Sequence, residues 1–505
     1  MIRHIICVLA CLHALTIVGR VQSDVPRIWD DEALKDWATP IAALKVRPGH
    51  YSAADYYSVP ADNLQTYPVY QLDREPAGYW DRLRKEQPRP LVDAAAMRTQ
   101  ADWIAAGERA FLELDAIEGR TSNPAILDRV RGPGGLQGLP TLPDGSVVGL
   151  RWVVTKAGVQ LSAAACVNCH FQVRPDGTLD VPGPAGPPPP DSPAFAPGAL
   201  GPLPASLATA AIRAFYLGEP PPMAIWRQFT VPWAPDPRVE RLRTAPPAEL
   251  RATMTGATAG FGLFPRAHAS PYAAPKIPDL TLLRYYRYID ATGTHRLRGP
   301  EDVARYVALV TGADTMDFGP YRILTDEQRR MRVRSADEVL YAIGVYLLSL
   351  EPPKNPDPQP PALVAAGREL FEEEGCIRCH APPNYTSGKL TLAAGFEPPA
   401  DHPDAAWIEP RTVETDPALA LQTRKGTGFY KIPSLRGVWR RPRLLHDASV
   451  GSLEEMFDRG RLEPTHLVGG ARGLAEPRRA IPGHRFGLFI SAEEKKALLA
   501  FLRSL

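Results

Sequence analysis

Two short motifs constrain this 505-residue chain more than any other feature. Residues 166–170 read CVNCH and residues 376–380 read CIRCH, so both have the spacing Cys-x-x-Cys-His. This spacing is the attachment pattern of c-type haem, in which two thiols add to one porphyrin and the histidine binds the iron. A zinc site, a disulfide or a redox dithiol would leave the histidine after each pair unexplained. We therefore predict two covalently attached c-type haems, with His170 and His380 as iron ligands. The predicted attachment residues are Cys166, Cys169, His170, Cys376, Cys379 and His380.

The other two cysteines, Cys7 and Cys11, lie in a basic and then apolar leader at residues 1–23. This pattern predicts a cleaved secretory signal peptide, and its apolar stretch is too short for a retained membrane anchor. We therefore expect a periplasmic or secreted protein without a stable membrane span. Export agrees with haem attachment, which takes place outside the cytoplasm.

The overall composition narrows the fold and the partners. Hydrophobic residues make up 44% of the chain and charged residues 23%, which is typical of a globular protein. The net charge is only +2, so no basic surface for nucleic acid is expected. The 55 prolines predict long irregular connections and disfavour a fold of regular β-sheet.

Three segments occur twice in the same order, each set flanking one haem motif. Residues 105–111 correspond to 365–371, residues 276–280 to 431–435, and residues 335–350 to 491–505. Ser335 and Ser491 are predicted N-caps, each with an acidic residue three positions later that completes a capping box. The chain therefore reads as a tandem repeat, and we predict a mainly α fold with two cytochrome c-like haem domains.

The two halves differ in length. The haem cysteine follows Gly107 by 59 residues in the first half, but follows Gly367 by only 9 in the second. The first half therefore carries long insertions, and residues 24–98 have no repeat partner and are rich in aromatic residues. We predict a signal peptide at 1–23, an N-terminal arm at 24–98 packed on the body, a first domain at 99–351, a proline-rich linker at 352–362 and a second domain at 363–505.

The chain resembles the bacterial di-haem cytochrome c peroxidase superfamily, which includes the enzyme that matures tryptophan tryptophylquinone and the di-haem rubber oxygenases. The resemblance is carried by residues 431–438 (KIPSLRGV), by His446-Asp447 and by residues 452–455 (SLEE). It implies that the C-terminal haem is six-coordinate and transfers electrons. It also implies that the N-terminal haem has an open position, where peroxide or O₂ binds.

The sixth iron ligands have several candidates. His446 stands in the family signature and is predicted as the ligand of the second iron, with a bond to a haem propionate as its alternative role. His484 and Met456 are its rivals. Because residues 171–267 contain no histidine, the first iron is either open or held by a more distant residue. The candidates for that position are Met223, His268 and His295.

Glu301 and Asp302 occupy the first-half position that matches Glu454 and Glu455. The resemblance implies that an acidic residue near this place assists O–O cleavage by moving protons, and we predict both as catalytic. The alternative is a pair of acids in the first turn of a helix, stabilised by the helix dipole.

Taken together, these features predict a periplasmic di-haem c-type cytochrome oxidoreductase of peroxidase type. Substrate chemistry is expected at the first haem and electron transfer through the second. The expected partners are a small-molecule oxidant, peroxide or O₂, and an electron-donor cytochrome or cupredoxin. Two alternatives are a non-enzymatic electron-transfer cytochrome and a di-haem oxygenase, whose apolar pocket would be lined by the insertion between Phe195 and Phe264.

Overall fold

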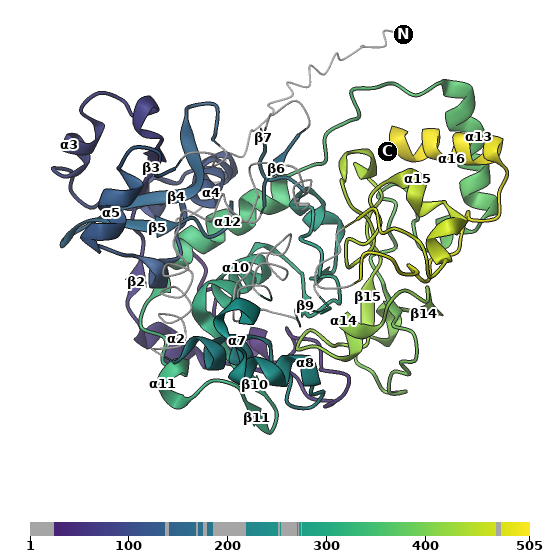
Figure 1. The fold of residues 1–505 in the computed structure, drawn as a ribbon, viewed down its shortest axis with the longest axis horizontal. Helices are drawn as coiled ribbons and strands as arrows, with labels where there is room; N and C mark the ends of the chain where they lie inside the picture. Colours follow the sequence, from purple (N-terminus) through teal and green to yellow (C-terminus); the bar gives the residue numbers. More distant parts are fainter. Residues whose placement is uncertain are drawn as a thin grey trace, which may run out of the picture.

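The computed structural model describes residues 25–136, 141–167, 170–174, 179–184, 219–250, 275–470 and 476–505, with four single residues between 250 and 275 (Figure 1). The predicted signal peptide lies outside these residues, as do Cys169, His268 and most of the insertion from 195 to 264. Across the described residues, every helix is too short or too polar to span a lipid bilayer.

Each half is organised around one pair of packed helices. In the first half, α4 (Gln100–Glu113) packs against α12 (Asp337–Ser349), and in the second, α13 (Pro361–Glu373) packs against α16 (Ala492–Ser504). Figure 1 shows α13 and α16 side by side at the upper right, next to the C-terminus. The paired helices are the segments that the repeat pairs in the sequence.

Glycine permits the same close crossing in both helix pairs. A Cβ atom on Gly107 would lie 2.0 Å from the carbonyl oxygen of Ala342, and one on Gly367 would lie 2.1 Å from that of Ala497. One turn further along each partner helix, an aromatic residue meets the same glycine: Tyr346 in the first half and Phe501 in the second. The two crossings therefore match residue for residue.

The predicted helix caps have different outcomes. Ser491 caps α16 and forms a capping box with Glu494, as predicted. The prediction for Ser335 is wrong: the N-cap of α12 is Ala336, which makes no side-chain cap bond. Ser335 instead belongs to β12 (Arg334–Ser335), which pairs in parallel with β2 (Ala61–Asp62) of the N-terminal arm.

The mainly α prediction needs correction, because the described residues form a mixed α/β structure. The longest strands, β4 (Ser146–Thr155) and β5 (Gly158–Ala163), make a hairpin that joins β3 (Thr66–Tyr70) in one sheet. The hairpin forms the last part of the insertion before the first haem motif, and α5 (Pro124–Val130) lies in its earlier part. The other pairings are β1 (Pro48–His50) with β10 (Asp314–Phe318) and β11 (Tyr321–Arg322), β6 (Gln172–Val173) with β7 (Leu179–Asp180), β8 (Tyr288–Ile289) with β9 (His295–Arg296), and β13 (Leu390–Leu392) with β14 (Ile408–Thr412) and β15 (Phe429–Lys431).

Short helices connect these elements. They are α1 (Asp31–Leu34), α2 (Ala53–Ser58), α3 (Tyr79–Leu83), α5 (Pro124–Val130), α7 (Pro221–Phe229), α8 (Pro237–Glu240), α10 (Pro300–Ala308), α11 (Asp326–Arg329), α14 (Ala418–Leu421) and α15 (Leu453–Met456).

The N-terminal arm is built into the first half. Its strands β1, β2 and β3 pair with β10, β12 and β4, which come from three distant parts of the chain. Trp29, Trp37 and Tyr56 are fully buried, and the rings of Trp29 and Tyr56 stack with their centres 4.6 Å apart. The arm therefore completes the core of the first half.

The two halves meet through the repeated segments at 276–280 and 431–435. The backbone N–H of Lys276 donates to the carbonyl of His446 (2.6 Å), and that of Lys431 donates to Ala291 (2.7 Å). The N–H of Ser434 donates to the Tyr286 hydroxyl (3.1 Å). Each repeat copy is thus held by the opposite half.

Gly367→Ala tests the helix crossing. Because the new methyl group would overlap the Ala497 carbonyl, we expect the free energy of unfolding to fall by about 1–3 kcal/mol. This loss outweighs the roughly 1 kcal/mol by which alanine is favoured over glycine inside a helix. Ala366→Ser, at the exposed neighbouring position, is the control and should change little. Denaturant unfolding followed by circular dichroism measures both; a Gly367→Ala protein as stable as the wild type would contradict the crossing.

Candidate haem sites

The second haem motif follows directly from α13. Gly375 adopts a left-handed conformation (φ 73°) that ends the helix, and the 3-10 turn Cys376–Arg378 begins at once. The N–H of His380 donates to the Cys376 carbonyl at 2.9 Å, which closes the turn. Both thiols, those of Cys376 and Cys379, are free. One tight turn therefore presents two thiols and one imidazole, as haem attachment requires.

The His380 ring is oriented by its Nδ1 atom. This atom lies 3.0 Å from the Pro433 carbonyl oxygen and 3.3 Å from that of Tyr385. Because both partners only accept hydrogen bonds, Nδ1 carries the proton and Nε2 keeps its lone pair for a metal. Burial lowers the pKa of His380 to about 4, so the ring is neutral at neutral pH.

His484 is the histidine that faces His380. Their ring centres lie 6.5 Å apart, and the ring planes make an angle of 50°. An ion held between two imidazoles by bonds of roughly 2 Å places the ring centres about 6 Å apart. The spacing therefore fits an iron bound by His380 on one side and His484 on the other.

A buried arginine fixes the loop that carries His484. Arg461 is fully buried, and its guanidinium donates to four carbonyl oxygens, those of Met456, Ile481, Gly483 and His484, at 2.7–3.1 Å. The N–H of His484 donates to the Val413 carbonyl at 2.6 Å, and its φ of 47° is rare for a residue other than glycine. Arg461 was not among the predicted site residues. Its partners are backbone atoms, which leave no pattern in the sequence.

The other two candidates for this position lie elsewhere. The His446 ring stacks on Tyr430, with centres 4.1 Å apart and planes 25° apart, and its backbone binds Lys276. Met456 ends α15, and its side chain is buried in the apolar core of the second half. The structure therefore brings His484 to His380, and places the predicted ligand His446 against Tyr430.

Buried positive charge surrounds the junction of the two halves. Lys276 and Lys431 are half-buried, and loss of solvent lowers the pKa of Lys276 to about 7 and that of Lys431 to about 8. The Nε atoms of Arg436, Arg440 and Arg441 are buried without a hydrogen-bond partner. Buried cations are costly unless anions compensate them. Asp180 and Asp279 already pair with Arg440 at 3.0 Å, whereas Lys276, Lys431 and Arg436 have no ion pair among the described residues. These three cations fit the carboxylates of haem propionates, so the residues present fit the predicted cofactor.

The first motif repeats the local geometry of the second. The His170 N–H donates to the Cys166 carbonyl at 3.2 Å, the same bond that closes the second motif. The backbone of Pro278, which is the repeat partner of Pro433, acts as a weak acceptor for the His170 ring and by itself would raise the pKa of that ring. The contact does not reach the geometry of a hydrogen bond. Burial is the larger effect and lowers the pKa of His170 to about 4.

The far side of His170 differs from that of His380. Within the described ranges, no histidine ring faces His170 as His484 faces His380; Phe111 lies 6.4 Å from it. Of the predicted candidates, Met223 is half-buried in α7, and His295 packs on Trp37 at 4.2 Å. His268 lies outside the described residues.

Glu301 and Asp302 lie in the first turn of α10. Asp302 is 2% exposed and accepts hydrogen bonds from the backbone N–H (2.8 Å) and Nε (2.9 Å) of Arg298, and it pairs with Arg305. Arg305 in turn donates to the Ile28 carbonyl of the arm. These contacts fasten the start of α10 to the arm, which is a structural role. Glu301 is half-buried, and proton transfer by these two residues stays a prediction.

Comparison with known proteins finds a distant and partial likeness. No protein-family model matches the chain, and no curated protein matches it. Matching structures include a MauG-like protein associated with microbial copper homeostasis, 18% identical with a TM-score of 0.23, and the hydrazine synthase of Kuenenia stuttgartiensis, 15% identical with a TM-score of 0.21. Each match covers 34% of this chain and little more than half of the other, 57% and 56% respectively. Likeness at this level supports no conclusion about function.

The number of haems tests both motifs. Produced with c-type maturation, the protein should carry two haems that remain bound after denaturation. Cys166→Ala/Cys169→Ala and Cys376→Ala/Cys379→Ala should each lose one. Intact mass and a pyridine haemochrome assay measure the count. Zinc or a disulfide at either motif would contradict the haem assignment.

Proposed function

We propose that this protein is a periplasmic di-haem c-type cytochrome oxidoreductase of peroxidase type. In this proposal the His380 haem, with His484 as its sixth ligand, transfers electrons, and the His170 haem meets peroxide or O₂. The observation that carries the proposal is the difference between the two sites. His484 stands opposite His380 at 6.5 Å, whereas no described histidine takes that place at His170.

The residues of the second half favour electron transfer. A haem supplies one-electron chemistry when bound, and binds an oxidant where its iron has an open position. His484 fills that position at the second site, and Arg461 holds the His484 loop through four hydrogen bonds. With His380 and His484 both holding the iron, such a haem would offer no position for a substrate.

The first half has the features of a substrate site. Its motif lies between a β-hairpin insertion and a second long insertion, and long loops around a cofactor are where pockets are usually built. The oxygenase alternative gains no support from the described aromatic residues of that insertion. Phe229 is buried against Val239 and Leu242, and Trp233 packs on Phe318, so these side chains form core.

Substituting the facing histidine tests the sixth ligand. His484→Ala should convert the signal of the His380 haem from low-spin to high-spin and leave that of the His170 haem unchanged, because only the second iron loses its sixth ligand. Arg461→Gln, which keeps the imidazole but loosens its loop, should give a mixture of the two states. Electron paramagnetic resonance and magnetic circular dichroism measure both. His446→Ala is the matched control and should leave the spin state unchanged; a spin change in this variant alone would return the assignment to His446.

Ligand binding tests whether only the His170 haem binds added ligands, as the proposed roles of the two haems require. The reduced protein is exposed to carbon monoxide, and we expect a spectral change in one haem only, absent from the Cys166→Ala/Cys169→Ala variant. Peroxide should oxidise a reduced donor cytochrome in the wild type, and this turnover should fall to background in the same variant. A stable O₂ adduct without peroxide turnover would instead identify an oxygenase. If neither haem binds any added ligand, the protein is an electron carrier and the proposal fails.

A further inference from the structure

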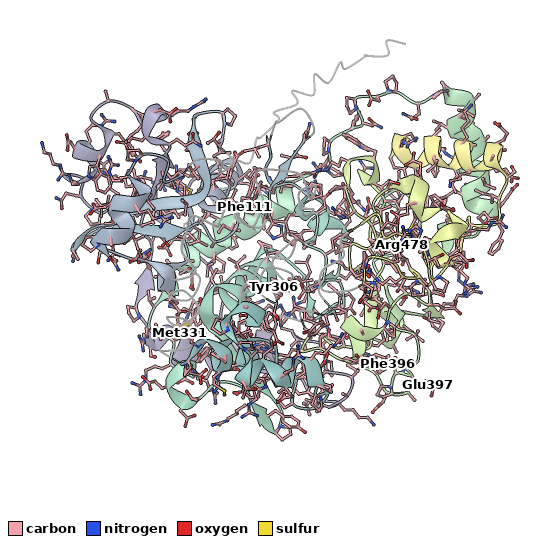
Figure 2. All side chains as sticks on the ribbon, in the orientation of Figure 1. Phe111, Tyr306, Met331, Phe396, Glu397 and Arg478 are labelled. Atoms are coloured by element: carbon pink, nitrogen blue, oxygen red, sulfur yellow. The ribbon has the colours of Figure 1, made fainter. Side chains whose placement is uncertain are left out.

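A small pocket has no residue of either Cys-x-x-Cys-His motif in its lining. Its volume is about 50 Å³, and its walls come from the N-terminal arm, the first half and the second half of the chain. Its polar lining includes His50 on β1, His295 and Thr294 at β9, Tyr306 on α10, and Asp290 and Lys425. Figure 2 shows Tyr306 near the middle of the molecule. We call this cavity the His50–His295 pocket.

The size of the pocket limits what it holds. Sites for organic ligands usually have volumes of about 300–1,000 Å³, so about 50 Å³ is too small for such a ligand. One ion or a few water molecules fit this space.

Two imidazoles in the pocket have nitrogen atoms without partners. Nδ1 and Nε2 of His50, and Nε2 of His295, are buried and make no hydrogen bond. The two ring centres lie 5.9 Å apart, and His295 is 5% exposed. Leaving a buried polar atom unsatisfied costs about 1–3 kcal/mol, and one ligand between the rings would satisfy one nitrogen of each.

A hydrogen-bond chain fixes the tautomer of His295. The Thr294 hydroxyl donates to Asp290 Oδ2 at 2.8 Å, so its oxygen accepts from Nδ1–H of His295 at 2.9 Å. Nε2 of His295 therefore presents a lone pair to the cavity. A histidine whose other nitrogen donates into a chain ending on a carboxylate has the usual surroundings of a metal-bound histidine.

The charges around the pocket are already balanced. Burial alone would raise the pKa of Asp290, but Lys425 and hydrogen bonds from Tyr306, Lys425 and Thr294 hold it at about 2. The Lys425 Nζ atom lies 2.9 Å from the Asp290 carboxylate. Burial also keeps both imidazoles neutral, lowering the pKa of His50 to about 4 and that of His295 to about 3. Asp314 and Arg424 also line the pocket, and the Asp314 carboxylate accepts from the Met316 backbone N–H at 2.8 Å. The ligand therefore meets two neutral nitrogen donors, beside two carboxylates and two cations whose charges cancel.

This donor set selects among metal ions. Imidazole suits zinc, copper, iron and nickel, whereas calcium and magnesium need oxygen ligands. Zinc needs about four ligands, and the described residues contain no cluster of three or more His, Cys, Asp or Glu side chains able to hold a metal. Copper(I) is stable with two nitrogen ligands in a nearly linear arrangement. With bonds of roughly 2 Å, two imidazoles on one ion have ring centres about 6 Å apart, close to the spacing of His50 and His295.

We propose that His50 and His295 bind one copper(I) ion, in a non-haem site shared by the arm and the first half. The proposal does not depend on the proposed function, because no residue of either haem motif takes part.

The holoprotein is the correct sample for the test. In it the four motif cysteines are consumed by haem, so no thiol competes for copper(I). The protein is treated with a chelator, equilibrated by anaerobic dialysis against copper(I) with ascorbate, and analysed for copper and iron by mass spectrometry. Two iron atoms per chain count the haems, and we expect one copper atom for every two iron atoms.

Four variants locate the ion. His50→Gln and His295→Gln should each weaken copper(I) binding by at least tenfold, whereas His402→Gln, a half-buried histidine outside the pocket, should bind as the wild type does. Thr294→Val keeps both imidazoles and removes only the hydrogen-bond chain from His295 to Asp290, so it should weaken copper(I) binding by about tenfold. This variant provides the test if the histidine variants do not fold. In a copper-loaded crystal, anomalous scattering at the copper edge should give one peak between the two rings.

Several results would overturn the proposal. Wild-type protein without stoichiometric copper would mean that the pocket holds only water. Equal copper binding in the His50, His295 and Thr294 variants would place the ion elsewhere. Retention of zinc in preference to copper(I) would refute the choice of ion, and a change of haem spin state in His295→Gln would identify His295 as a haem ligand instead.

Discussion

The close crossing of two helices, made once in each half, determines where the candidate haem sites lie. In the second half, α13 passes through Gly375 straight into the haem motif, so the crossing at Gly367 fixes the start of that motif. The partner helix α16 begins shortly after the loop that carries His484, so the same contact also anchors the opposite side of the site. The helix crossing thus supports both sides of the site, and Arg461 then fixes the loop that brings His484 to His380. The matching crossing at Gly107 does the same for α4 and α12 in the first half, where the insertions then separate the motif from its helix.

The features predictable from the sequence are those that depend on local spacing. Both haem motifs, the repeated helices and the Ser491 cap need only residues close together in the chain, and the helices and cap were predicted correctly. The hairpin of β4 and β5 could also have been predicted from the sequence, because residues 146–155 (SVVGLRWVVT) are rich in β-branched residues. The high proline content favoured the mainly α prediction, which ignored that run. Ser335 failed as a cap because its partner, Asp62, lies in the distant arm.

The candidate site was harder to predict because its geometry depends on partners far apart in the sequence. His446 stands in the recognisable signature, yet its ring packs on Tyr430, whereas His484 is placed by an arginine that binds only backbone carbonyls. Asp302 is an instructive contrast. Its partner Arg305 lies three residues later in the same helix, so this structural ion pair is visible as helical spacing, whereas Arg298 precedes the helix. Local charge pairs of this kind deserve weight before a carboxylate is given a catalytic role.

The strand pairing of the arm has a consequence for how the chain folds. The Thr315 hydroxyl bonds to the Gly49 carbonyl across a separation of 266 residues, and β1 pairs with β10 over a similar span. Contacts this distant raise the contact order and slow folding. Strands β1 and β2 of the arm precede the first motif, while their partners β10 and β12 follow it, so during synthesis these two pairings wait until β10 and β12 have emerged. Closure of these two pairings is therefore a late step in the folding of the first half.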